Sequence, residues 1–149
     1  MSKKNELEMA LKEAMRAQDT MRKNTLRLVL SAIKEAEVLK QDELDDAAVL
    51  GILQKEVKSR QESISDAEKA KRDDLIKESR GEIKILEDYL PKAMSDEDLD
   101  MLITEAIAES GASALTEMGN VMKLVLPRVQ GRADGGKVSQ IVRQKLQGE

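Results

Sequence analysis

The spacing of apolar residues along this chain constrains its fold more than any other feature. Leu, Ile, Val, Met and Ala recur three and four residues apart through almost the whole sequence. That spacing places side chains on one face of a helix, whereas a half-buried strand requires alternation with period two. No stretch alternates over a useful length. The sequence therefore predicts an all-α protein.

Local signals divide this pattern into seven expected helices. Either Ser2 or Asn5 is a suitable N-cap for the first helix, and Asp19 precedes the second. The acidic stretch 42–46 restarts a third helix, and the pattern lapses into charges at 69–74 before a fourth. We predict an N-terminal four-helix unit over residues 1–91.

The second expected helix, from about residue 21 to 41, carries two apolar stripes. Leu26, Val29, Leu30 and Ile33 form the first, and the second stripe consists of Leu28, Ala32 and Leu39. A helix that is apolar on two faces is typical of the centre of a bundle.

Pro91 marks the clearest boundary, because proline ends the helix before it. Ser95 and the acids that follow it form a strong helix start, and Gly111 is expected to end that helix. Ser113 is a candidate cap for the next helix, whose last turn Pro127 is expected to distort. Asp134 is the candidate cap of the final helix. We predict a three-helix tail unit over residues 92–149.

Composition excludes several kinds of chemistry. Cys and His are absent, so disulfides, thiolate catalysis, cysteine-bound metals and imidazole acid–base chemistry are excluded. No run of residues is apolar enough to cross a bilayer, and the first residues form no apolar signal segment. We therefore expect a cytoplasmic protein that does not associate with membranes. Carboxylates at the predicted helix starts are explained by capping, and no calcium-loop or nucleotide-binding motif occurs, so we predict no catalytic residue, no metal and no cofactor.

Charge is distributed unevenly in the predicted tail. Residues 92–117 hold one Lys against seven acidic groups, and residues 118–149 hold six Lys or Arg against two acidic groups. Phosphates of a nucleic-acid backbone pair with such cations. The candidate phosphate contacts are Lys123, Arg128, Arg132, Lys137 and Arg143. Gly131, Gly135 and Gly136 are expected to shape the turn before the last helix, since glycine allows positive φ and close approach.

Several stretches resemble one known family. They are RKNTLRLVLSAIKEAE (22–37), EIKILEDYLP (82–91), SDEDL (95–99), ESGAS (109–113) and EMGNVMKLVLPRVQGRADGGKVSQIV (117–142). Through them the whole chain resembles the YqeY family, and its last third resembles the helical tail domain of GatB and related subunits of tRNA-dependent amidotransferases. One segment departs from the pattern: residues 61–75 in family-like form carry an aromatic near Ala67 and a glycine near Lys71.

The resemblance implies a function of binding. In the amidotransferases an equivalent tail helps to hold tRNA, so it implies a non-catalytic helical binding module that contacts tRNA or a tRNA-handling protein complex through backbone phosphates. Two alternatives remain open at this point. One is a protein-interaction adaptor with a protein partner. The other is an accessory subunit in amide transfer, the work of a carbon–nitrogen ligase with glutamine as amide donor, without an active site of its own.

Overall fold

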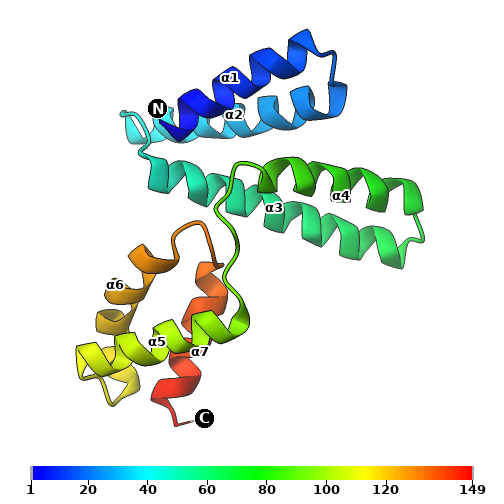
Figure 1. Ribbon diagram of the computed structural model, residues 1–149. Helices are drawn as coiled ribbons and strands as arrows, with labels where there is room; N and C mark the ends of the chain where they lie inside the picture. The colour runs from blue at the N-terminus through cyan, green and yellow to red at the C-terminus, as the bar shows by residue number, and fades with distance from the viewer. Residues whose placement is uncertain (1, 149) are drawn as a thin grey trace. The chain divides into compact units, whose positions relative to one another are not determined.

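The computed structural model describes residues 2–148, and these contain seven α-helices, one 3₁₀ turn and no strand (Figure 1). The prediction of an all-α fold is confirmed. The α-helices are α1 (Lys3–Arg16), α2 (Thr20–Lys40), α3 (Asp46–Lys69), α4 (Asp73–Glu87), α5 (Asp96–Ser110), α6 (Met118–Val129) and α7 (Gly135–Leu146). The chain divides into two compact units, Met1–Pro91 with α1 to α4 and Lys92–Glu149 with α5 to α7.

Side-chain caps start four of the helices. The Ser2 hydroxyl accepts a hydrogen bond from the Asn5 N–H, and the Asp19 carboxylate accepts one from the Arg22 N–H, each at 3.1 Å. Asp45 caps α3 and Ser95 caps α5 in the same way. Each such cap contributes about 1 kcal/mol. The predicted starts at Asp19 and Ser95 are confirmed.

The first unit consists of two helical hairpins, α1 with α2 and α3 with α4 (Figure 1). Its core is aliphatic and draws on all four helices, and α2 packs against each of the other three. The buried members of this core are Leu7, Ala14, Leu26, Val29, Ile33, Val49, Leu53 and Leu86. The first predicted stripe of α2 therefore faces the core. The second stripe does not, because Leu28 and Leu39 remain exposed.

A buried ionic cluster joins α3 to α4. Arg60 is only 9% exposed, and its guanidinium donates to Glu56 at 2.5 Å and to Glu82 at 2.9 Å. Glu56 lies one turn before Arg60 on α3, and Glu82 lies on α4. The cluster thus satisfies a charge that would be costly to bury alone.

Left-handed residues close the three turns of this unit. Gln18, Gln41 and Lys71 have φ of 56°, 59° and 56°. At the end of α3, the Arg72 N–H bonds to the Ala67 carbonyl and the Lys71 N–H to the Glu68 carbonyl, which is the Schellman arrangement. The backbone at Lys71 is left-handed, a conformation that strains a side chain and that glycine adopts without strain.

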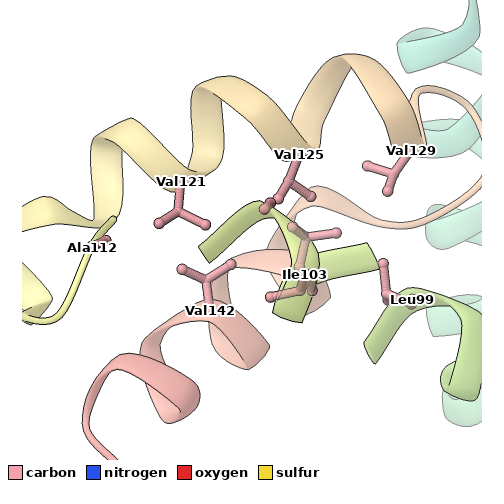
Figure 2. Packing of buried hydrophobic residues seen from close by; sticks show 9 residues of the cluster. Leu99, Ile103, Ala112, Val121, Val125, Val129 and Val142 are labelled. Carbon is pink, nitrogen blue, oxygen red and sulfur yellow. The ribbon is translucent and has the colours of Figure 1, made fainter. Parts of the chain in front are cut away.

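The second unit packs α5, α6 and α7 around a core rich in valine (Figure 2). Figure 2 shows Ile103 of α5, Val121 and Val125 of α6, and Val142 of α7 gathered in this core. The full buried set is Leu99, Ile103, Ala106, Ala112, Val121, Val125, Val129, Val138 and Val142.

Two local predictions for this unit have different outcomes. Gly111 ends α5 with φ of 71°, as expected. The predicted cap at Ser113 is wrong: a 3₁₀ turn, Leu115–Glu117, precedes α6, and its N-cap is Ala114. The Ser113 N–H instead donates to the Glu117 carboxylate at 3.4 Å.

Candidate nucleic-acid interface

The five predicted cations come from three places in the second unit, and all five are exposed. Lys123 and Arg128 lie on α6, Arg132 lies in the turn after α6, and Lys137 and Arg143 lie on α7. The structure divides them into three that contact α5 or the segment before it and two that do not.

Arg128 links the last turn of α6 to the last turn of α5. Its guanidinium donates to the Glu109 carboxylate at 2.7 Å. This hydrogen bond, together with the Glu109 charge, raises the pKa of Arg128 above its usual value. Both side chains are exposed, so this is a surface ion pair, a class that contributes about 0–1 kcal/mol.

Arg132 holds the segment that leads into α5. Its Nε donates to the Lys92 carbonyl at 3.0 Å, and its own carbonyl accepts the Met94 N–H at 3.0 Å. The side chain and backbone of Arg132 thus fix residues 92–94, which lie outside the helices.

Two lysines connect α7 to α5. Lys137 pairs with Asp96, and Lys145 pairs with Asp100 at 2.8 Å. Asp96 and Asp100 are one turn apart on the same face of α5. Lys137 and Lys145 are about two turns apart on α7. The acidic half of the unit therefore neutralises much of its basic half.

Lys123 and Arg143 differ from these residues. The side chain of neither residue forms a hydrogen bond or an ion pair with any residue in the described range 2–148. At 100° per residue, Lys123 lies about 200° from buried Val121, on the outer side of α6. Arg143 lies about 100° from buried Val142 on α7. They are available to an external anion, but they stand on separate helices and form no single cluster.

The three glycines have different structural roles. Gly131 is buried and has φ of 75°, so the turn after α6 requires a left-handed residue there. Gly135 and Gly136 are the first two residues of α7, are exposed, and have no positive φ. A Cβ at Gly135 would meet nothing within 4 Å. Asp134 holds the N-cap position before them.

No helix in the described part of the chain is long and apolar enough to span a membrane. Among residues 2–148, no group of three or more Asp or Glu side chains is arranged to hold a metal ion.

Comparison with known proteins identifies the family. The model of the YqeY family, described as Yqey-like protein, matches residues 4–146. The chain belongs to the YqeY family. The resemblance drawn from the sequence motifs is thereby confirmed for YqeY.

Curated proteins from three fungi are also similar to this chain. Altered inheritance of mitochondria protein 41, mitochondrial, from Kluyveromyces lactis is 39% identical over 69% of this chain and 57% of its own length. The protein of the same name from Pyrenophora tritici-repentis is 29% identical over 95% of this chain and 77% of its own. The one from Saccharomyces cerevisiae (strain YJM789) is 31% identical over 83% and 66%. The chain thus spans between about half and three quarters of the length of these relatives.

These relatives overturn one expectation. We expected a cytoplasmic protein, and each of these relatives is named as mitochondrial. The inference failed because the absence of an apolar signal segment bears only on secretion. Mitochondrial targeting segments are amphipathic and basic, so that test does not detect them.

Proposed function

We propose that this YqeY-family protein is a non-catalytic helical module that contacts tRNA, or a tRNA-handling complex, through backbone phosphates. The observation that carries the proposal is the pair Lys123 and Arg143. Both are exposed and have no partner among residues 2–148. They belong to the unit whose motifs resemble the tRNA-holding tail of the amidotransferases.

The chemistry of the unit favours recognition of backbone over recognition of bases. Tyr89 is the only aromatic residue of the chain, and it lies in the first unit. The second unit therefore has no ring on which an unpaired base could stack. Lysine and arginine side chains bind phosphates of any sequence, so the module would respond to the shape and charge of the RNA.

The three partnered cations form a second group of contacts. Arg128 and Lys137 make ion pairs at the surface, which are weak enough for a phosphate to replace the carboxylate. Arg132 already uses its Nε to hold a backbone carbonyl. We therefore assign the strongest phosphate contacts to Lys123 and Arg143, and weaker ones to Arg128, Arg132 and Lys137.

Titration of the full chain with bulk tRNA over a series of salt concentrations tests this proposal. A log–log slope of about −2 is expected if two cations contact phosphate, and about −4 if all five do. The Lys123→Glu/Arg143→Glu double variant should bind about tenfold more weakly or worse, with a shallower slope. Circular dichroism of each variant checks that the helices are intact.

The matched control reverses two exposed charges in the first unit, Lys12→Glu/Lys55→Glu, which changes the net charge equally. It should retain most of the affinity. Glu109→Gln releases Arg128 and should strengthen binding by about two- to fivefold. Equal losses in the variant and the control, or binding that is insensitive to salt, would overturn the proposal.

A further inference from the structure

The charges of α2 set this helix apart from the other helices of the first unit. It carries five Lys or Arg against two acidic residues, a net charge of +3, and α7 in the second unit has the same net charge. In α1, α3 and α4 the acidic residues nearly equal or outnumber the basic ones. Residues 20–34 of α2 include no acidic residue. The first unit therefore has a basic helix of its own.

Three of these cations form a row along the outer side of α2. At 100° per residue, Lys23 lies about 40° and Lys34 about 20° from Arg27 around the helix axis, both on the same side. Arg27 lies about 200° from the buried Val29. Arg27 and Lys34 are exposed, and Lys23 is half-buried. These three cations, Lys23, Arg27 and Lys34, are called the α2 row below.

The charge of the α2 row is not compensated within the described range 2–148. None of its three side chains forms a hydrogen bond or an ion pair with a residue in that range. On a helix, residues three or four positions apart are close enough to pair. The only acidic residues at those positions around the row are Asp19 and Glu37. Asp19 pairs with Arg22, and Glu37 pairs with Lys4, so both carboxylates are already engaged.

The geometry of the α2 row fits an extended polyanion. At 1.5 Å per residue its cations are about 6 Å and 10 Å apart along the helix axis, which is too far for one phosphate group to bridge them. Asn24 and Ser31 are exposed and lie within about 60° of Arg27, both on one side of the row. Amide and hydroxyl groups donate to the phosphate and sugar oxygens of a nucleic-acid backbone, including the ribose 2′-hydroxyl. The cations and their polar neighbours together favour a strand of RNA as the occupant.

We propose that the α2 row binds backbone phosphates of RNA, so that the RNA-binding surface of this protein includes a second part within the first unit. This inference rests on the proposed function and extends it from residues 92–149 to residues 1–91. Arg22 does not belong to the row, because its guanidinium donates to Asp88 and Tyr89. The row adds affinity without selecting bases, since phosphates are the same in every sequence.

Titration of the full chain with bulk tRNA at several salt concentrations tests the α2 row. The variant Lys23→Gln/Arg27→Gln/Lys34→Gln removes its three charges and keeps polar side chains that suit a helix. This variant should bind tRNA about tenfold more weakly than the native chain, and its log–log salt slope should be shallower by about two. Circular dichroism checks that its helix content is unchanged.

The matched control removes the same number and kinds of charge from other helices of the first unit. It is Lys55→Gln/Lys77→Gln/Arg80→Gln, at exposed positions on α3 and α4. Its affinity for tRNA should stay within about twofold of the native value, because net charge alone does not place a cation against a phosphate. Equal losses in the variant and this control would overturn the inference.

Photo-cross-linking locates the RNA directly, because the chain has no cysteine of its own. Asn24→Cys places a single thiol beside the α2 row, and Gln61→Cys places one at an exposed position on α3. Each variant is labelled with an azidophenacyl group and irradiated with tRNA. Position 24 should cross-link to the RNA far more efficiently than position 61. Cross-linking that is equal at both positions, or absent at position 24, would contradict the inference.

The outcomes separate this inference from the proposed function. If Lys123→Glu/Arg143→Glu weakens tRNA binding and the α2-row variant does not, the inference is wrong and the proposed function stands. If only the α2-row variant weakens binding, the row stands and the contacts of the second unit are wrong. A native chain that does not bind tRNA overturns both. An α2-row variant that loses binding to vesicles of phosphatidylglycerol and phosphatidylcholine, but not to tRNA, shows that the occupant is a lipid surface and overturns the inference.

Discussion

The two units of this protein differ in the residues at their tight turns and in the exposure of their ion pairs. In the first unit the left-handed turn positions are Gln18, Gln41 and Lys71, and in the second they include Gly111 and Gly131. A side chain at positive φ costs about 1–2 kcal/mol, which glycine avoids. The first unit therefore carries backbone strain at its turns, and the second unit avoids it.

The ion pairs of the two units differ in how exposed their side chains are. Arg60 of the first unit is buried between two helices, and Lys4 reaches across from α1 to Glu37 on α2 with both side chains largely covered. In the second unit the pairs of Arg128 and Lys137 are exposed. Arg60 and Lys4 thus join helices through largely covered ion pairs. The pairs of Arg128 and Lys137 also join helices, but they are exposed enough to exchange with an external anion.

Replacing Arg60 or, in a separate variant, Arg128 by methionine should give the largest difference between the two units in the free energy of unfolding. Arg60→Met leaves Glu56 and Glu82 without their partner in a partly buried site, and we expect a loss of about 2 kcal/mol in the free energy of unfolding. Arg128→Met should cost less than about 0.5 kcal/mol. Urea unfolding followed by far-ultraviolet circular dichroism measures both, and equal effects would contradict the contrast between the units.

Substitutions at two turns should change the stability of the protein in opposite directions. Gly131→Ala forces a side chain into a buried left-handed position and should destabilise the protein by about 1–2 kcal/mol. Lys71→Gly removes the same strain and should stabilise it by up to about 1 kcal/mol, less the entropy that glycine adds to the unfolded chain. Thermal melts of the two variants give the comparison, with the exposed helical Gly119→Ala as a control outside any turn.

A smaller effect is expected at the Lys4–Glu37 contact. The Lys4 ammonium and the Leu44 N–H both donate to Glu37, and these hydrogen bonds lower the pKa of its carboxyl. Because the folded pKa lies below the unfolded one, the stabilisation is present above the unfolded value and is lost as pH falls through the folded value. Unfolding curves of the native chain and Glu37→Gln should therefore differ at neutral pH and converge below about pH 4. A difference that persists unchanged in acid would contradict this assignment.

Most of the fold follows from local signals in the sequence. The caps at Asp19 and Ser95 and the stop at Gly111 depend on residues within one helical turn, and the structure confirms them. The wrong cap at Ser113 shows the limit of such signals. A hydroxyl before a helix is a candidate cap, but the chain forms a 3₁₀ turn two residues after it, with Ala114 at the N-cap position.

The candidate interface was less accessible to sequence reasoning, because its cations are partnered over long separations. Lys137 pairs with Asp96, 41 residues away, and Arg128 pairs with Glu109, 19 residues away. From the sequence, Asp96 is explained as a first-turn acid of α5, and nothing local indicates that it also faces α7. The sequence shows that residues 92–117 and residues 118–149 carry opposite net charges, but only the fold shows that these charges neutralise one another.

Tyr89 gives this two-unit comparison a practical handle. The Arg22 guanidinium donates to the Tyr89 hydroxyl at 2.7 Å and lies 5.9 Å from the centre of the Tyr89 ring. The ring is therefore held against the first turn of α2. As the sole aromatic residue, Tyr89 supplies all of the intrinsic fluorescence and near-ultraviolet absorption. An optical signal of that kind reports the melting of residues 1–91 alone, while residues 92–149 unfold unseen.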